Sequence, residues 1–83
     1  MSNEHEIMVT IQSGRGSKEF RFPQQTKVQD AANEAARAFG YPDSERYALV
    51  RATGEELEGQ RTLVSYHIQN GEILSLSATG SGV

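Results

Sequence analysis

The amino-acid sequence predicts a small α+β domain in which a mixed sheet of four or five strands carries one helix on one face. Three observations lead to this fold class. Two segments with alternating apolar residues flank a glycine-containing turn, a stretch with helical periodicity follows, and further short apolar segments complete the chain. A hairpin, a crossover helix and more strands in one sheet form an α+β arrangement. The 83 residues leave room for one domain, which we place at residues 1–78.

The first two strands are predicted to form a hairpin near the N-terminus. The residues that alternate at period two are Ile7, Val9, Ile11, Phe20 and Phe22. Between them, Ser13–Ser17 contains two glycines and favours a hairpin turn. This stretch lacks the longer glycine fingerprint of a phosphate-binding loop, and no helix follows it directly. We therefore interpret it as a turn.

A helix is predicted between Thr26 and Gly40. The apolar residues at helical spacing are Val28, Ala32, Ala35 and Phe39. Thr26, followed three residues later by Gln29, forms a capping-box signature that would satisfy the first amides of the helix. Gly40 suits the left-handed position just past the helix, and Pro42 prevents its continuation.

The C-terminal half is predicted to add more strands to the sheet. Tyr47–Val50 forms a third strand, and Leu57 lies in a very short strand beyond a turn. Thr62–Ile68 is expected to be a connector with one helical turn. Glu72–Ala78 forms the last strand, with Ile73, Ser75 and Ser77 on one face.

The spacing of residues in this half resembles that of ubiquitin. The matching residues are Leu57-Glu58, Arg61-Thr62-Leu63, Tyr66, Ile68 and Leu74-Ser75-Leu76. The first half is similar in the order of its elements. The resemblance implies a ubiquitin-like β-grasp fold over nearly the whole chain, with Tyr66 locking a loop. The glycine-bearing end also resembles that of bacterial ubiquitin-like modifiers, which are encoded beside their own activating, conjugating and deconjugating enzymes.

The tail at residues 79–83, expected to be flexible, is the first candidate site. It contains Gly80 and Gly82 but ends in Val83, so it has no Gly-Gly pair. The resemblance implies a protein modifier that is joined to target proteins through its C-terminal glycine. We expect a peptidase, for which a zinc metallopeptidase is one candidate, to remove Val83 and expose Gly82. Activating-like and conjugating-like enzymes would then be its partners. Activation at Val83 itself and an ordinary frayed terminus are the alternatives.

The second candidate site is a face of the sheet. Arg51, Ser75 and Ser77 stand where ubiquitin has apolar or His side chains, and Leu49 is expected to supply some apolar surface nearby. Through this face the chain would act as a non-conjugated interaction module, similar to the small ubiquitin-like proteins attached to bacterial secretion systems. A sulfur carrier, similar to the β-grasp proteins of thiamin and molybdopterin synthesis, is a third class.

Composition narrows the function classes further. Cysteine is absent, which excludes disulfides and thiol nucleophiles and favours the cytoplasm. The net charge of −3 argues against binding to nucleic acid or anionic membranes. His5 and His67 lie far apart, so no metal site is expected. The acidic residues at 55–58 are interpreted as a solvated turn. We expect a protein that is no enzyme and holds no cofactor.

Overall fold

A computed structural model describes residues 6–42 and 46–78 of the chain. The predicted tail, with Gly80, Gly82 and Val83, lies outside the described residues. The strands are β1 (Glu6–Ser13), β2 (Gly16–Pro23), β3 (Tyr47–Arg51) and β4 (Glu72–Ala78), and the helices are α1 (Val28–Phe39) and the single 3₁₀ turn η1 (Val64–Tyr66).

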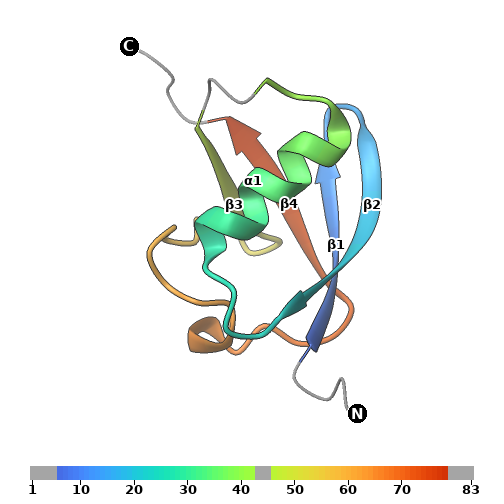
Figure 1. The fold of residues 1–83 in the computed structure, drawn as a ribbon. Helices are drawn as coiled ribbons and strands as arrows, with labels where there is room; N and C mark the ends of the chain where they lie inside the picture. The colour runs from blue at the N-terminus through green and yellow to red at the C-terminus, as the bar shows by residue number, and fades with distance from the viewer. Residues whose placement is uncertain (1–5, 43–45, 79–83) are drawn as a thin grey trace.

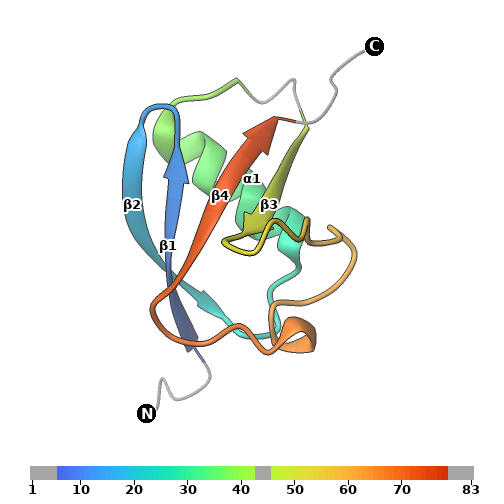
Figure 2. The ribbon, with the colours of Figure 1, turned by 180° about the vertical axis from the view of Figure 1, so that it is seen from behind.

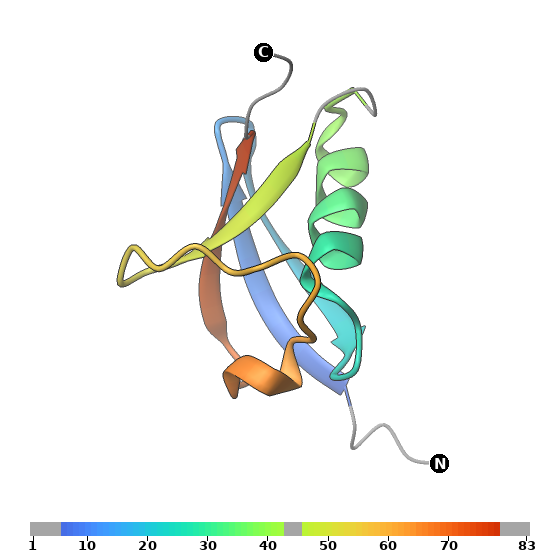
Figure 3. The ribbon, with the colours of Figure 1, turned by 90° about the vertical axis from the view of Figure 1, so that its left-hand side faces the viewer.

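The four strands form one sheet in the order β2-β1-β4-β3. The central pair, β1 and β4, is parallel, whereas β1 pairs with β2 and β3 pairs with β4 in antiparallel fashion. The helix α1 crosses one face of this sheet, and the opposite face carries no helix (Figure 1, Figure 3). The predicted fold class, a mixed sheet with one helix on one face, is confirmed.

The hairpin between β1 and β2 turns at Gly14 and Arg15, as the glycine pattern predicted. Arg15 also ties the hairpin to the end of α1. Its Nη1 donates hydrogen bonds to the carbonyls of Phe39 (3.2 Å) and Gly40 (3.0 Å), and its guanidinium lies 4.4 Å from the centre of the Tyr41 ring. The turn is therefore a structural element that fixes the helix C-terminus.

The start of α1 differs from the predicted capping box. Lys27 is the residue before the helix, and no side chain caps it. Instead, the amide of Val28 donates to the carbonyl of Arg61 (2.8 Å), and the amide of Gln29 donates to that of Gly59 (3.1 Å). Because backbone carbonyls of a distant loop already satisfy these amides, the Thr26 side chain has no capping role to fill.

The end of α1 follows the prediction. Gly40 adopts a left-handed conformation with φ of 85°, which a glycine tolerates without strain. Its amide donates to the carbonyl of Arg37 (3.0 Å), and the amide of Tyr41 donates to that of Ala36 (2.9 Å). Two helix carbonyls are satisfied in this way, and the chain turns back towards β3.

The core lies between α1 and the sheet. Its largest fully buried side chains come from β1, β3, β4, the start of α1 and the loop after β3: Val9, Ile11, Val28, Leu49, Leu57, Leu63 and Leu74. Four buried alanines, Ala31, Ala32, Ala35 and Ala36, bring the helix close to the sheet. The helical and strand periodicities of the sequence therefore locate the core correctly.

The segment after β3 contains less strand than was expected. Only one bridge, between Val50 and Glu56, extends the sheet there, and the amide of Leu57 donates to the carbonyl of Leu49 (2.9 Å). The predicted helical turn is confirmed as η1. The Tyr66 hydroxyl accepts a hydrogen bond from the amide of Glu58 (2.8 Å), so its loop-locking role is confirmed as well.

Candidate protein-binding surface

The face of the sheet opposite α1 carries no helix, and we take it as the candidate surface for a partner (Figure 2). Alternation along the strands places one uncharged set of side chains on this face, which we call the open face: Met8, Thr10 and Gln12 from β1, Val50 from β3, and Ile73, Ser75 and Ser77 from β4. Not one of these seven residues carries a charge. Glu19 and Arg21 of the edge strand β2 are exposed on the same side of the sheet, so a partner that covers the seven residues and stays off β2 desolvates no ion.

Strand register brings these side chains into rows. Ser75 lies opposite Val50 on one side and Gln12 on the other, and Ile73 lies opposite Thr10. Ile73 has 44% of its surface exposed, which makes it one of two exposed large apolar side chains among the described residues. The other, Val64, belongs to η1 and not to the sheet. Ile73 is therefore the exposed large apolar side chain of the open face.

Leu49 was predicted to supply part of this surface, and that prediction is wrong. Leu49 is 0% exposed and packs in the core. The open-face position is taken by Val50, which is half-buried and pairs with Ser75. Neighbouring residues of a strand point to opposite faces. The prediction was wrong by one residue and therefore named the buried side chain in place of the exposed one.

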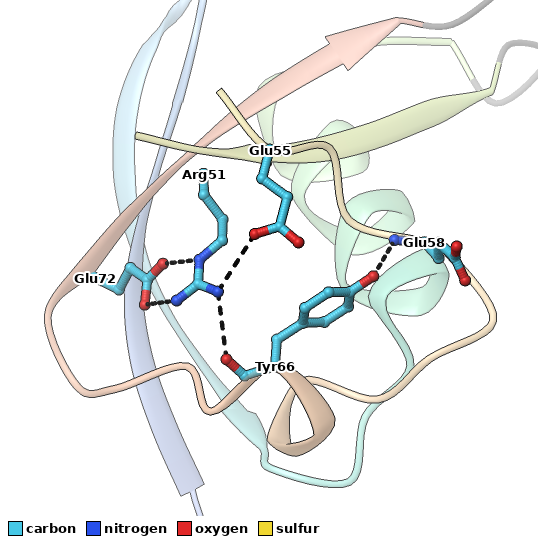
Figure 4. A network of polar contacts seen from close by, with 5 residues as sticks. All are labelled: Arg51, Glu55, Glu58, Tyr66 and Glu72. Carbon is cyan, nitrogen blue, oxygen red and sulfur yellow. Dashed lines mark hydrogen bonds and ion pairs between the residues drawn. The ribbon is translucent and has the colours of Figure 1, made fainter. Parts of the chain in front are cut away.

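Arg51 also differs from its predicted place on a binding surface (Figure 4). By alternation it shares the side of the strand that holds Leu49, and its guanidinium is held by neighbours. Nε donates to one carboxylate oxygen of Glu72 at 2.7 Å, and Nη2 donates to the other at 3.1 Å. Nη1 donates to the carbonyl of Tyr66 at 3.3 Å and lies 3.7 Å from the Glu55 carboxylate.

The contacts of Arg51 stabilise its charge. The hydrogen bond to Glu72 raises the pKa of the Arg51 guanidinium above its ordinary value, and the charges of Glu72 and Glu55 act in the same direction. This residue joins β3, β4 and η1 through its side chain. Its role in the described structure is to hold the end of the sheet together.

Ser75 and Ser77 lie on the open face and are exposed. Their contact with a partner stays a prediction. The sequence missed Val50 and did not single out Ile73 as a site. The signal for Ile73 was present, because its alternation with Leu74 already placed it on the face of the two serines.

The described residues show no cluster that points to catalysis. Among residues 6–42 and 46–78, no polar or charged side chain is buried, and no group of three His, Asp or Glu residues is arranged to hold a metal ion. A groove of about 560 Å³ lies between the start of α1, β3 and the loop at residues 56–60, and its charged lining residues Arg46, Glu56 and Glu58 are all exposed. No helix in the described ranges is long and apolar enough to cross a membrane.

A comparison with protein-family models places this fold in a family. Residues 7–76 match the model described as "WXG100 protein secretion system (Wss), protein YukD". The chain belongs to the YukD family. The match to YukD runs from β1 into β4 and includes every open-face residue except Ser77. A comparison with curated proteins gave no match.

Solved structures similar to this YukD-family chain are ubiquitin-like. A de novo designed protein based on ubiquitin has a TM-score of 0.80 at 21% identity, covering 96% of each chain. The ubiquitin-like domain of an Arabidopsis thaliana protein has a TM-score of 0.76 at 16% identity, covering 98% of this chain and 85% of that one. A chain of the pParkin–pUb–UbcH7 complex has a TM-score of 0.79 at 16% identity, over 94% of this chain and 24% of that chain. These likenesses show the ubiquitin-like β-grasp fold.

Proposed function

We propose that this protein is a non-catalytic, ubiquitin-like binding module that works with the components of a WXG100 protein secretion system. The observation that carries the proposal is the match of residues 7–76 to the YukD family model. The open face supports it, because a set of uncharged side chains that includes an exposed isoleucine suits contact with another protein. The module would act in a bacterial cytoplasm, where it meets the secretion components.

Ile73 and Val50 would supply the apolar contact in this interaction. Ile73 is exposed and Val50 half-buried, and the polar side chains of Ser75 and Ser77 border them. Apolar side chains at the centre of an interface, surrounded by polar groups, carry most of the binding free energy in protein complexes. The partner should therefore present an apolar side chain to Ile73 of β4 and Val50 of β3.

The test is a pair of substitutions at the two exposed apolar residues. Ile73→Arg places a charge on the open face, and Val64→Arg makes the same change on η1, outside the sheet. We expect Ile73→Arg to abolish co-purification with components of a WXG100 secretion system and to stop secretion of a WXG100 substrate. Val64→Arg should leave both unchanged. Equal behaviour of the two variants would contradict the proposal.

Conjugation through the tail is a second candidate function. The sequence favours this function, because the five residues at 79–83 include Gly80 and Gly82. In this function residues 1–78 form the folded domain, and a peptidase removes Val83 from the tail. An activating-like and a conjugating-like enzyme then join the Gly82 carboxylate to an amine of a target protein.

The intact mass of the chain separates these candidates. After co-expression with candidate peptidase and activating enzymes, loss of Val83 or an adduct on Gly82 would support conjugation. Exchange of one terminal oxygen for sulfur would indicate a sulfur carrier. An unchanged mass, together with normal secretion in a chain lacking residues 79–83, would leave the binding module as the function.

A further inference from the structure

The edge of the sheet formed by β2 has backbone groups that could pair with a further strand. In the sheet order β2-β1-β4-β3, β2 is an edge strand eight residues long, and α1 does not cover its outer side (Figure 1). Its residues are exposed except Phe20, which is half-buried, and Phe22, which is buried. An edge of this length offers its free backbone groups to another strand.

Hydrogen bonds on the other side of β1 show which backbone groups of β2 point outward. The amide of Met8 donates to Oδ1 of Asn70 (2.9 Å), and the carbonyl of Met8 accepts from the amide of Gly71 (2.7 Å). Both groups of Met8 therefore point away from β2. Its partner Arg21 is in a non-hydrogen-bonded pair, so the amide and carbonyl of Arg21 point to the outer edge.

Alternation along β2 extends this result to two more residues. Ser17 and Glu19 have the same orientation as Arg21, since backbone groups in an antiparallel pair change sides at every residue. The outward groups of β2 thus belong to Ser17, Glu19 and Arg21. The last two carry opposite charges, and both side chains are exposed on the face of the sheet away from α1.

We propose that two copies of this chain pair through the outer edges of their β2 strands, antiparallel and centred on Phe20. In this register Glu19 of each copy lies opposite Arg21 of the other, so the two-fold axis creates two ion pairs from one sequence. About four backbone hydrogen bonds, two in each Glu19–Arg21 pair, join the strands, and the two sheets become one continuous sheet.

Charge selects this register over its neighbours. A register centred on Glu19 or on Arg21 would also let the outward backbone groups of the two strands pair. It would place two like charges opposite each other, which is destabilising. Centring on Phe20 also sets the two Phe20 rings in a closely spaced, non-hydrogen-bonded pair on the α1 side. That ring already stacks on Phe22, with centroids 5.7 Å apart. Charges on an edge usually discourage pairing, whereas here their alternation is self-complementary.

The association is tested with the full chain by sedimentation from about 10 μM to about 1 mM. We expect the wild type to move towards twice the chain mass as concentration rises. Glu19→Arg and Arg21→Glu should each weaken the dimer about tenfold or more, because each places like charges opposite one another. A wild type that stays monomeric throughout this range would overturn the proposal.

Charge exchange makes the test specific to the register. An equimolar mixture of Glu19→Arg and Arg21→Glu restores both opposite-charge pairs and should dimerise, as should the double variant that carries both changes. The matched controls are Glu56→Arg and Arg46→Glu, which make the same charge changes beside the opposite edge of the sheet and should leave the dimer intact. Failure of the mixture and of the double variant to recover would contradict this pairing.

Amide hydrogen exchange gives an independent readout. At high concentration the amides of Glu19 and Arg21 should become protected, while the amides of Lys18 and Phe20, which point towards β1, should not change. Equal protection at low and high concentration would contradict the pairing. Glu19 and Arg21 lie on the same side of the sheet as Ile73, so the Ile73 test is made in a chain with wild-type β2 and does not depend on these variants.

Discussion

The guanidinium of Arg51 contacts both carboxylate oxygens of Glu72, with Nε 2.7 Å from one oxygen and Nη2 3.1 Å from the other. This pair joins the last residue of β3 to the first residue of β4. The same guanidinium donates to the carbonyl of Tyr66, so one side chain holds two strands and η1 together. Bidentate contacts of this kind are among the stronger ion pairs at a protein surface.

Replacing Glu72 with Gln should lower the free energy of unfolding by about 1 kcal/mol, since the substitution removes the charge and one of the two acceptors. Urea unfolding monitored by circular dichroism measures the change. Glu56→Gln is the control, because Glu56 is exposed and its side chain makes no hydrogen bond or ion pair among the described residues. Equal midpoints for both variants would show that the pair contributes nothing.

The decrease in unfolding free energy caused by Glu72→Gln should be the same from about pH 6 to about pH 9. The Glu72 carboxylate raises the pKa of Arg51, so the stabilisation is present below the ordinary pKa of an arginine and is lost only as the pH rises above it. Unfolding curves at both ends of this range give the measurement. A difference between wild type and variant that shrinks at the higher pH would contradict this assignment.

Tyr66→Phe should destabilise the protein by about 1 kcal/mol, because it leaves the amide of Glu58 without its acceptor. Faster exchange of that amide should accompany the loss. Tyr41→Phe serves as the control, since the Tyr41 hydroxyl accepts or donates no hydrogen bond among the described residues. If Glu58 exchanges at the same rate in both variants, Tyr66 does not lock this loop.

Leu49→Ala should cost about 3 kcal/mol, as expected for a fully buried leucine that leaves a cavity. Val50→Ala, one residue along the strand, should cost about 1 kcal/mol or less, because Val50 is only half-buried on the open face. Thermal and urea unfolding report both values. A larger loss of stability for Val50→Ala than for Leu49→Ala would show that Leu49 is the surface residue of the two.

Thr26→Ala should change the free energy of unfolding by about 0.5 kcal/mol or less, since the Thr26 side chain caps no helix amide. A working capping box would instead lose about 1 kcal/mol. Chemical denaturation of the purified variant distinguishes these values, and the larger loss would show that the cap forms after all.

The sequence predicted the elements well because their periodicities are local. Alternation in β1 and helical spacing from Val28 to Phe39 each depend on a short stretch of chain. The face of β3 could not be predicted in this way. Its first four residues, Tyr47 to Val50, are all apolar, so the pattern contains nothing that separates the buried side from the exposed one.

The start of α1 was mispredicted for a different reason. The amides of Val28 and Gln29 are satisfied by carbonyls of Arg61 and Gly59, about thirty residues away in the chain. A capping signature reports only on neighbouring residues. Contacts that form when the loop closes over the helix leave no local trace in the sequence.

The parallel pairing of β1 with β4 places the first and the last strand of the domain side by side at the centre of the sheet. Synthesis on the ribosome therefore delivers the final central strand last, after the hairpin and α1 have already emerged. Until Leu74 arrives, the inner edge of β1 and the apolar side chains of Val9 and Ile11 have no partner. Nascent chains of this protein are thus exposed to aggregation until β4 has emerged and paired with β1.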